Sequence, residues 1–175
     1  VRVMAALALA RGGDITAAEK LAAELDKTFP LDTLVQRYWL PTIRAAVALE
    51  RKDPHQAVKL LQMASAIELS EPAQAIVYLC PVYLRGEAYL MLQDGKAAAM
   101  EFQKFIDHYG LVANFPWGSL ARLGLARAYA LEAATDPSAR EKARTAYQAF
   151  LALWKDADPD VPILRAAKAE YAKLN

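Results

Sequence analysis

The sequence contains a single cysteine, Cys80, among its 175 residues. One cysteine cannot form an intramolecular disulfide, so no disulfide framework is available to this chain, although the compartment stays open. Charge of one sign is also missing, because 20 acidic residues nearly cancel 21 basic ones. This balance gives no electrostatic reason to expect nucleic acid or an anionic membrane as a partner.

Long apolar runs are scarce as well. The longest uncharged stretch around Cys80 covers residues 72–84, which is too short to span a bilayer, since that takes about 20 helical residues. No secretory signal is visible, so we expect no direct membrane insertion by these residues. Because the chain starts at Val1 and not at methionine, we expect it to be a piece of a longer protein. Its location stays open between the cytoplasm and the extracytoplasmic side of a membrane-anchored parent.

The residues that usually carry chemistry form no recognisable motif. The seven glycines match neither of the glycine-rich phosphate-binding fingerprints. His55, His108 and Cys80 fall in different predicted elements and lack the spacing of metal ligands. A nucleophilic cysteine would need a base beside it, and the pattern places no histidine near Cys80. We therefore expect no catalytic residue, no metal and no cofactor, and we do not expect an enzyme.

What the chain has in abundance is alanine, at about one residue in five, and alanine is the strongest helix former. Valine, isoleucine and threonine are sparse, which disfavours a sheet. Turn signals such as Gly13-Asp14, Asp53-Pro54 and Asp136-Pro137 divide the chain into helices. The expected helices cover residues 2–11, 15–28, 33–51, 54–69, 72–93, 96–109, 116–134, 137–155 and 162–174.

Two prolines, Pro41 and Pro81, fall inside these predicted helices. A proline inside a helix lacks a hydrogen-bond donor and clashes with the preceding turn, which costs about 3 kcal/mol. Their similar placement indicates a kink shared by two long helices. The alternative is that each consists of two helices with a break between them. A third backbone expectation is a left-handed cap at Gly110, after the helix over 96–109.

One pattern recurs about every 40 residues. A small residue marks each copy, at Ala6, Ala45, Gly86 and Ala126. An alanine follows at Ala18, Ala57, Ala98 and, after an insertion near Asp136–Arg140, at Ala143. Self-similarity at such a period is typical of a solenoid built from helix pairs.

The copies resemble the tetratricopeptide repeat. In the best one, four signature positions hold Gly86, Tyr89, Ala98 and Phe102. Small residues there let the two helices of a pair approach closely, and the aromatic ring fills the gap toward the next pair. We accordingly expect six residues to be largely buried, namely Tyr89, Ala98, Phe102, Tyr129, Tyr147 and Phe150.

The resemblance implies an all-α fold, a right-handed α-solenoid of antiparallel helix pairs with a C-terminal capping helix. It implies a single domain over residues 1–175. The repeats are expected at about 1–30, 31–70, 71–110 and 114–158, and the capping helix at about 160–174.

Residues 109–174 are also similar to the C-terminal repeat region of large bacterial multidomain proteins, often receptor-type serine/threonine kinases. Segments 123–131, 146–159 and 167–174 carry this likeness. It implies a sensor or docking tail without catalysis, since the chain has none of the kinase motifs. We expect a non-catalytic protein–protein interaction or sensory module of a larger bacterial signalling protein, with a protein or peptide ligand. The alternatives are a self-association module and a kinase fragment whose catalytic domain lies outside these residues.

In this family the first helices of the pairs form the inner, concave face. By helical phase, the candidate binding residues there are Trp39, Thr42, Tyr83, Glu87, Leu123 and Arg127. Peptide-clamping relatives hold a terminal carboxylate with lysine and asparagine, and neither stands at the equivalent positions here. The expected face is instead an apolar, aromatic groove with arginine, which are residue types that dominate interfaces. The alternative is that the long first helices simply pack on one another.

Overall fold

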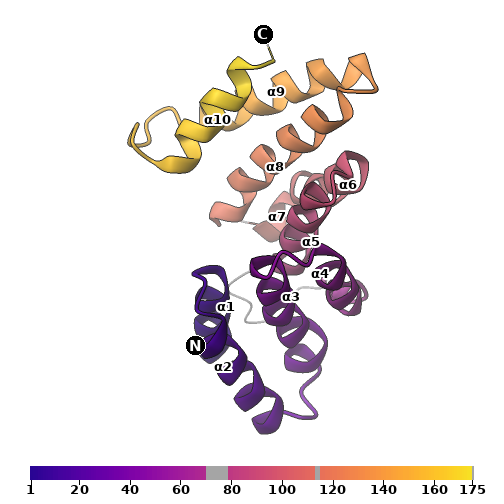
Figure 1. The fold of residues 1–175 in the computed structure, drawn as a ribbon, viewed down its shortest axis with the longest axis vertical. Coiled ribbons are helices and arrows are strands. Elements are labelled where there is room, and N and C mark those ends of the chain that lie inside the picture. The colour runs from indigo at the N-terminus through magenta and orange to yellow at the C-terminus, as the bar shows by residue number, and fades with distance from the viewer. Residues whose placement is uncertain (70–78, 113–114, 175) are drawn as a thin grey trace. The chain divides into compact units, whose positions relative to one another are not determined.

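The computed structural model describes residues 1–69, 79–112 and 115–174. Helices and the turns between them make up these residues, and none of them is in a strand, which confirms the all-α prediction. The helices pack mostly against their neighbours along the chain (Figure 1). The chain divides into two compact units, Val1–Leu92 and Gln93–Asn175.

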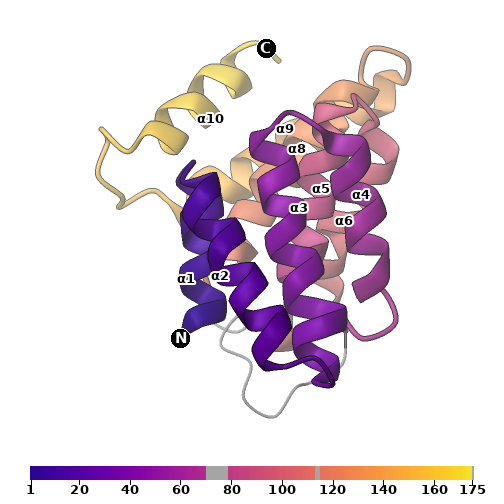
Figure 2. The ribbon, with the colours of Figure 1, turned by 60° about the horizontal axis from the view of Figure 1, so that its bottom comes forward.

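In the first unit, α1 (Arg2–Arg11) pairs with α2 (Ile15–Thr28), and α3 (Leu40–Glu50) pairs with α4 (Pro54–Leu61). The helix α5 (Cys80–Met91) packs against α3 and α4. Figure 2 shows α2 and α4 on either side of α3. The helix α3 is therefore the central element of this unit.

In the second unit, α8 (Pro116–Glu132) packs against both α6 (Gly95–Asp107) and α9 (Pro137–Leu153). The last helix, α10 (Pro162–Ala172), packs on α9. The short helix α7 (Tyr109–Val112) follows α6 after one residue, His108. Since Gly110 lies within α7 and has no positive φ, the predicted left-handed cap at this glycine is wrong.

An aspartate begins the second helix of every predicted pair. Asp14, Asp53, Asp94 and Asp136 each accept a hydrogen bond from a backbone N–H of the first turn, at 2.8 to 3.1 Å. Such a cap satisfies one of the N–H groups that a helix start leaves without an intrahelical partner. The four helix starts thus follow one local rule that is legible in the sequence.

In three of these turns, the residue before the aspartate has a left-handed backbone. Its φ is 86° at Gly13, 61° at Lys52 and 59° at Gln93. This conformation costs an ordinary L-residue roughly 1–2 kcal/mol, because its Cβ crowds the next carbonyl oxygen. The same turn is therefore built three times at the same point of the predicted repeat, and only Gly13 has the favoured residue type.

At Pro41 the helical path continues. Before α3 the backbone makes a π turn, η1 (Val35–Trp39), in which the N–H of Leu40 donates to the carbonyl of Val35, five residues earlier. The wider turn leaves Pro41 in the first turn of α3, where its missing N–H is tolerated. A π turn thus accommodates this proline.

Pro81, by contrast, lies at the start of a helix. Leu79 has a φ of 60°, and α5 begins directly after it, with Pro81 in its first turn. The side chain of Tyr38 forms hydrogen bonds with the backbone of Leu79 and Cys80 at this helix start. The shared kink is therefore wrong for Pro81. The part of the predicted helix over 72–78 lies outside the described residues.

The core of the second unit follows the repeat pattern. Ala98, Phe102, Tyr147 and Phe150 are buried, as predicted. The ring of Phe102 lies so close to Gly124 that a Cβ there would stand 2.5 Å from a ring carbon. The glycine therefore lets the aromatic ring of α6 pack directly on α8. By contrast, Tyr89 and Tyr129 are only partly buried, which corrects the prediction for those two rings.

Candidate interaction surfaces

Two of the predicted binding residues of the first unit are core side chains. Thr42 has no exposed surface, and its hydroxyl donates a hydrogen bond to the carbonyl of Tyr38. Tyr83 is 7% exposed. Trp39 is partly buried, and its ring meets that of Tyr38 edge to face at 4.8 Å between centroids. Thr42 and Tyr83 are thus buried where the prediction placed them on an open face.

Glu87, the fourth predicted residue of this unit, forms an ion pair with Arg11. The Arg11 guanidinium donates two hydrogen bonds to its carboxylate, at 2.6 and 3.0 Å. These residues lie 76 positions apart and join the end of α1 to α5. Along α3 every residue from Leu40 to Leu49 is buried except Arg44. The first helices of this unit therefore fill much of their own face by packing on one another.

In the second unit, Leu123 is 1% exposed and belongs to a cluster with Phe150 and Leu164. Arg127 is partly exposed, and its guanidinium donates two hydrogen bonds to Glu170 of α10, both at 2.9 Å. The Tyr147 hydroxyl donates to the same carboxylate at 2.9 Å. Leu123 and Arg127 therefore help to hold α10 in place. The binding role of the six residues remains a prediction, although Thr42, Tyr83 and Leu123 are buried.

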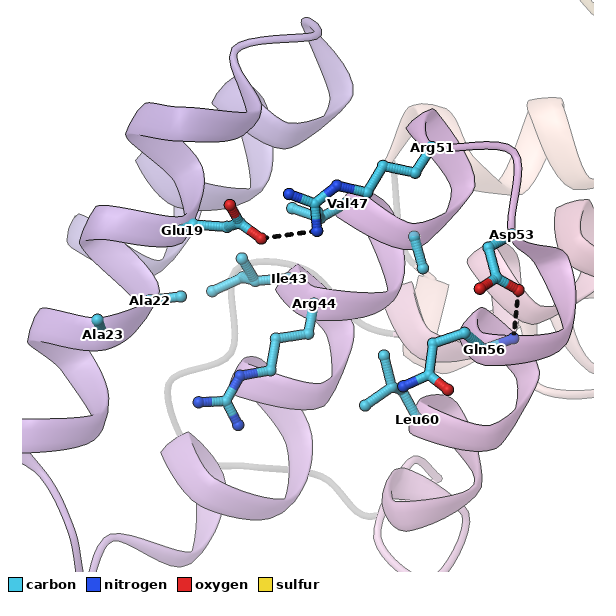
Figure 3. A pocket seen from close by; sticks show the side chains of 11 residues that line it. Glu19, Ala22, Ala23, Ile43, Arg44, Val47, Arg51, Asp53, Gln56 and Leu60 are labelled. Atoms are coloured by element: carbon cyan, nitrogen blue, oxygen red, sulfur yellow. Dashed lines mark hydrogen bonds and ion pairs between the residues drawn. The ribbon is translucent and has the colours of Figure 1, made fainter.

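In the first unit, an open groove lies between α2 and α4, on a side of α3 that holds none of the predicted binding residues (Figure 3). We call it the α3 groove. Its volume is about 540 Å³. Its lining residues are Glu19, Ala22, Ala23, Ile43, Arg44, Val47, Ala48, Arg51, Asp53, Gln56 and Leu60.

Ion pairs run along one edge of the α3 groove. Arg51 contacts Glu19 at 2.8 Å, and Arg44 contacts Asp26 at 2.7 Å, so α2 and α3 are joined twice. Hydrogen bonds from Gln36 and Arg44 lower the pKa of Asp26. All four charged side chains are about half exposed. Exposed pairs of this kind are weak, so the arginines can exchange their partners at little cost.

A second groove lies over α8, between α6 and α9, and we call it the α8 groove. Its volume is about 360 Å³. Its lining residues are Ile106, Arg122, Leu125, Tyr129, Glu141, Lys142, Thr145, Ala146 and Ala149. The Lys142 ammonium stands 5.8 Å from the centre of the Tyr129 ring, within the range of a cation–π contact.

No protein-family model, curated protein or solved structure matches this chain. The likeness to tetratricopeptide repeats therefore rests on the repeat pattern of the sequence.

Each groove occupies the same place in its own unit. The α3 groove lies between α2 and α4, and the α8 groove between α6 and α9. In both cases these are second helices of predicted pairs, and the floor is the first helix of a pair. None of the six binding residues predicted from the sequence lines either groove. The sequence did contain one signal for the α3 groove. Arg44 and Arg51 are seven residues apart, which places them on the same side of a helix.

Among residues 1–69, 79–112 and 115–174, no group of histidine, cysteine and carboxylate side chains could hold a metal ion. No helix in those ranges is long and apolar enough to cross a membrane. Cys80 is fully buried, and that burial raises the pKa of its thiol to about 12. Its thiol is thus held in the unreactive, protonated form.

Proposed function

We propose that this chain is a non-catalytic protein-interaction module made of tetratricopeptide-like helix pairs. Two packing features support the repeat assignment. The left-handed turn before a capping aspartate recurs at Gly13, Lys52 and Gln93. The aromatic ring of Phe102 packs against a small residue, Gly124, in the first helix of the next predicted pair, as the repeat logic requires.

The observation that carries the interaction role is the α3 groove. It combines buried apolar side chains, such as Ile43 and Val47, with half-exposed arginines at its edge. Hydrophobic contacts supply affinity, and exposed charges supply orientation and specificity, in most protein interfaces. A protein or peptide segment is the ligand that fits such an open groove best.

The parent of this module is, in this proposal, a larger bacterial signalling protein. The support is the similarity of residues 109–174 to repeat regions that follow signalling domains. A kinase domain, where one is present, would then lie outside these residues, and the module would supply docking or sensing.

Site-specific photocross-linking tests the interaction role. A benzoylphenylalanine in place of Gln56 faces the α3 groove, whereas the same group in place of the exposed His55 points to another side of α4. We expect the Gln56 position to capture one partner protein reproducibly and the His55 position to capture none. The purified partner should then bind this chain, and Arg51→Glu should weaken that binding. Identical adducts from both positions would contradict the proposal.

Self-association is a second candidate function, and the outer face of α1 favours it. Val1, Met4, Ala5, Ala8 and Leu9 fall on the side of α1 away from its buried residues, and each is exposed or partly exposed. An apolar helix face of this kind commonly marks a contact. Sedimentation velocity decides the matter, since a dimer that Ala8→Glu converts to monomer would support self-association.

A further inference from the structure

The α8 groove does not end at Arg122. A second hollow of about 410 Å³ shares Ile106 and Arg122 with it. This hollow continues toward the start of α8, where Gly118 and Ser119 form part of its lining. From Gly118 to Tyr129 the two hollows follow about 16 Å of one helix face, since an α-helix rises about 1.5 Å per residue. That length suits about five residues of an extended peptide.

The α8 groove and this second hollow together form what we call the double groove. Its end near the start of α8 carries apolar side chains that are open to water. Tyr109 is 79% exposed and Leu153 is 59% exposed, and both line the second hollow. Phe105 and Trp154 lie in the same lining. Large apolar groups left in water beside a hollow are typical of an interaction site.

Arg122 stands at the junction of the two hollows. It is partly exposed and forms no ion pair with any residue in the described part of the chain. At the other end, the Lys142 ammonium stands 5.8 Å from the centre of the Tyr129 ring, and the neighbouring carboxylate Glu141 pairs with Arg144 at 3.7 Å. Arg122 is therefore a cation at the centre of the groove, and no carboxylate among the described residues pairs with it.

We propose that the double groove over α8 binds a short peptide segment with apolar side chains on both sides of one acidic residue, which pairs with Arg122. This proposal rests on the proposed interaction role. An acidic side chain at that place would receive charge-assisted hydrogen bonds from a guanidinium that shares its hollow with apolar side chains such as Ile106 and Leu125. The apolar neighbours would cover Tyr109 and Leu153 at one end and Tyr129 at the other.

Peptide selection tests this inference. The probe is a phage-displayed library of random 12-residue peptides, selected on the full chain and then synthesised with a fluorescein label for anisotropy titrations. We expect the selected peptides to share one acidic residue between apolar residues. Arg122→Glu should weaken their binding by about tenfold or more, as loss of a charge-assisted bond predicts. Arg122→Lys, which keeps the charge, should lose less.

The matched control is Arg165→Glu, which makes the same charge change at an exposed arginine of α10 outside the groove. It should change binding by less than about twofold. Circular dichroism checks that each variant is folded. Selected peptides without an acidic residue, or equal binding by Arg122→Glu, would overturn the inference.

Three further outcomes separate this inference from the proposed function. Binding that is lost in Arg44→Glu but kept in Arg122→Glu would place the peptide in the α3 groove, so the inference fails and the interaction role stands. Failure to select any peptide, together with no cross-linked partner at Gln56, would overturn both. A dimer that Arg122→Glu dissociates would show a second copy in the groove and would overturn the peptide proposal.

Discussion

Arg85 is a charged residue inside the first unit. Its side chain and that of Glu68 are each only 3% exposed. The guanidinium donates to both oxygens of Glu68, at 2.8 and 2.9 Å, and to the carbonyl of Leu61 at 3.2 Å. A buried charge without its partner is far more costly than the pair, so each of these side chains depends on the other.

We therefore predict that Glu68→Gln destabilises the protein by about 3–5 kcal/mol, because it removes the charge of the carboxylate that pairs with the buried Arg85 guanidinium. Urea unfolding followed by circular dichroism measures this change. Glu19→Gln is the matched control, since it removes an exposed pair with Arg51 and should cost less than about 1 kcal/mol. Similar small losses in both variants would show that the buried pair is not a source of stability.

Among the elements, the left-handed turns give the next prediction. Lys52 and Gln93 adopt the same backbone as Gly13 in equivalent turns. Glycine reaches this conformation without a Cβ clash but loses more entropy on folding. We expect Lys52→Gly to stabilise the protein by about 0.5–1 kcal/mol in chemical denaturation, since relief of the clash exceeds the entropic loss. Gly13→Ala should have the opposite sign, and a loss of stability in Lys52→Gly would contradict this account.

The carboxylate of Glu170 joins α10 to α8 and α9, since it accepts hydrogen bonds from Arg127 and Tyr147. Burial alone would raise the pKa of Glu170, but hydrogen bonds and charge from Arg127, together with the Tyr147 hydroxyl, hold that pKa below its usual value. The contribution of Glu170 to stability is then complete above the unfolded pKa of about 4.3 and is lost as pH falls through the lower folded pKa. We predict that acidification below about pH 4 reduces the free energy of unfolding more in the parent protein than in Glu170→Gln. Urea titrations at several pH values would refute this by giving parallel curves.

Local rules predicted the helices best where a turn signal marked both ends. The sequence predicted α1 and α2 at their observed bounds, because Gly12-Gly13-Asp14 stops one helix and caps the next. It failed at α5, which begins after a left-handed Leu79, where the backbone of Leu79 and Cys80 forms hydrogen bonds with the side chain of Tyr38, some 40 residues away in the chain. No local pattern reports such a distant partner.

The candidate site was harder to predict for a related reason. Helical phase says which residues share a face, and on that ground the sequence analysis grouped Thr42 with Trp39. It does not say how far neighbouring helices cover that face. The pair between Arg11 and Glu87 brings α1 and α5 together across 76 positions, and Thr42 lies buried in the same unit. The grooves became visible only once the packing of the second helices was known.

At the scale of the whole molecule, each of the two units has its own buried core. Ile43 and Leu61 are among the fully buried side chains of the first unit, and Phe102 and Phe150 among those of the second. In the solenoid that we propose, stability would be close to a sum of local contributions and nearest-neighbour contacts. A defect in one unit should therefore be felt mainly in that unit.

We predict that Phe102→Ala, which should cost about 3–5 kcal/mol, raises amide hydrogen exchange mainly in the second unit. The lost ring packs on Gly124 of α8, so α6, α8 and α9 should lose protection while α1 to α4 keep theirs. Hydrogen-exchange mass spectrometry resolves the units peptide by peptide. The reciprocal variant Ile43→Ala should produce the opposite distribution, because Ile43 is buried in α3. An equal loss of protection along the whole chain in both variants would mean that the units unfold as one cooperative body, and local energetics would then not describe this protein.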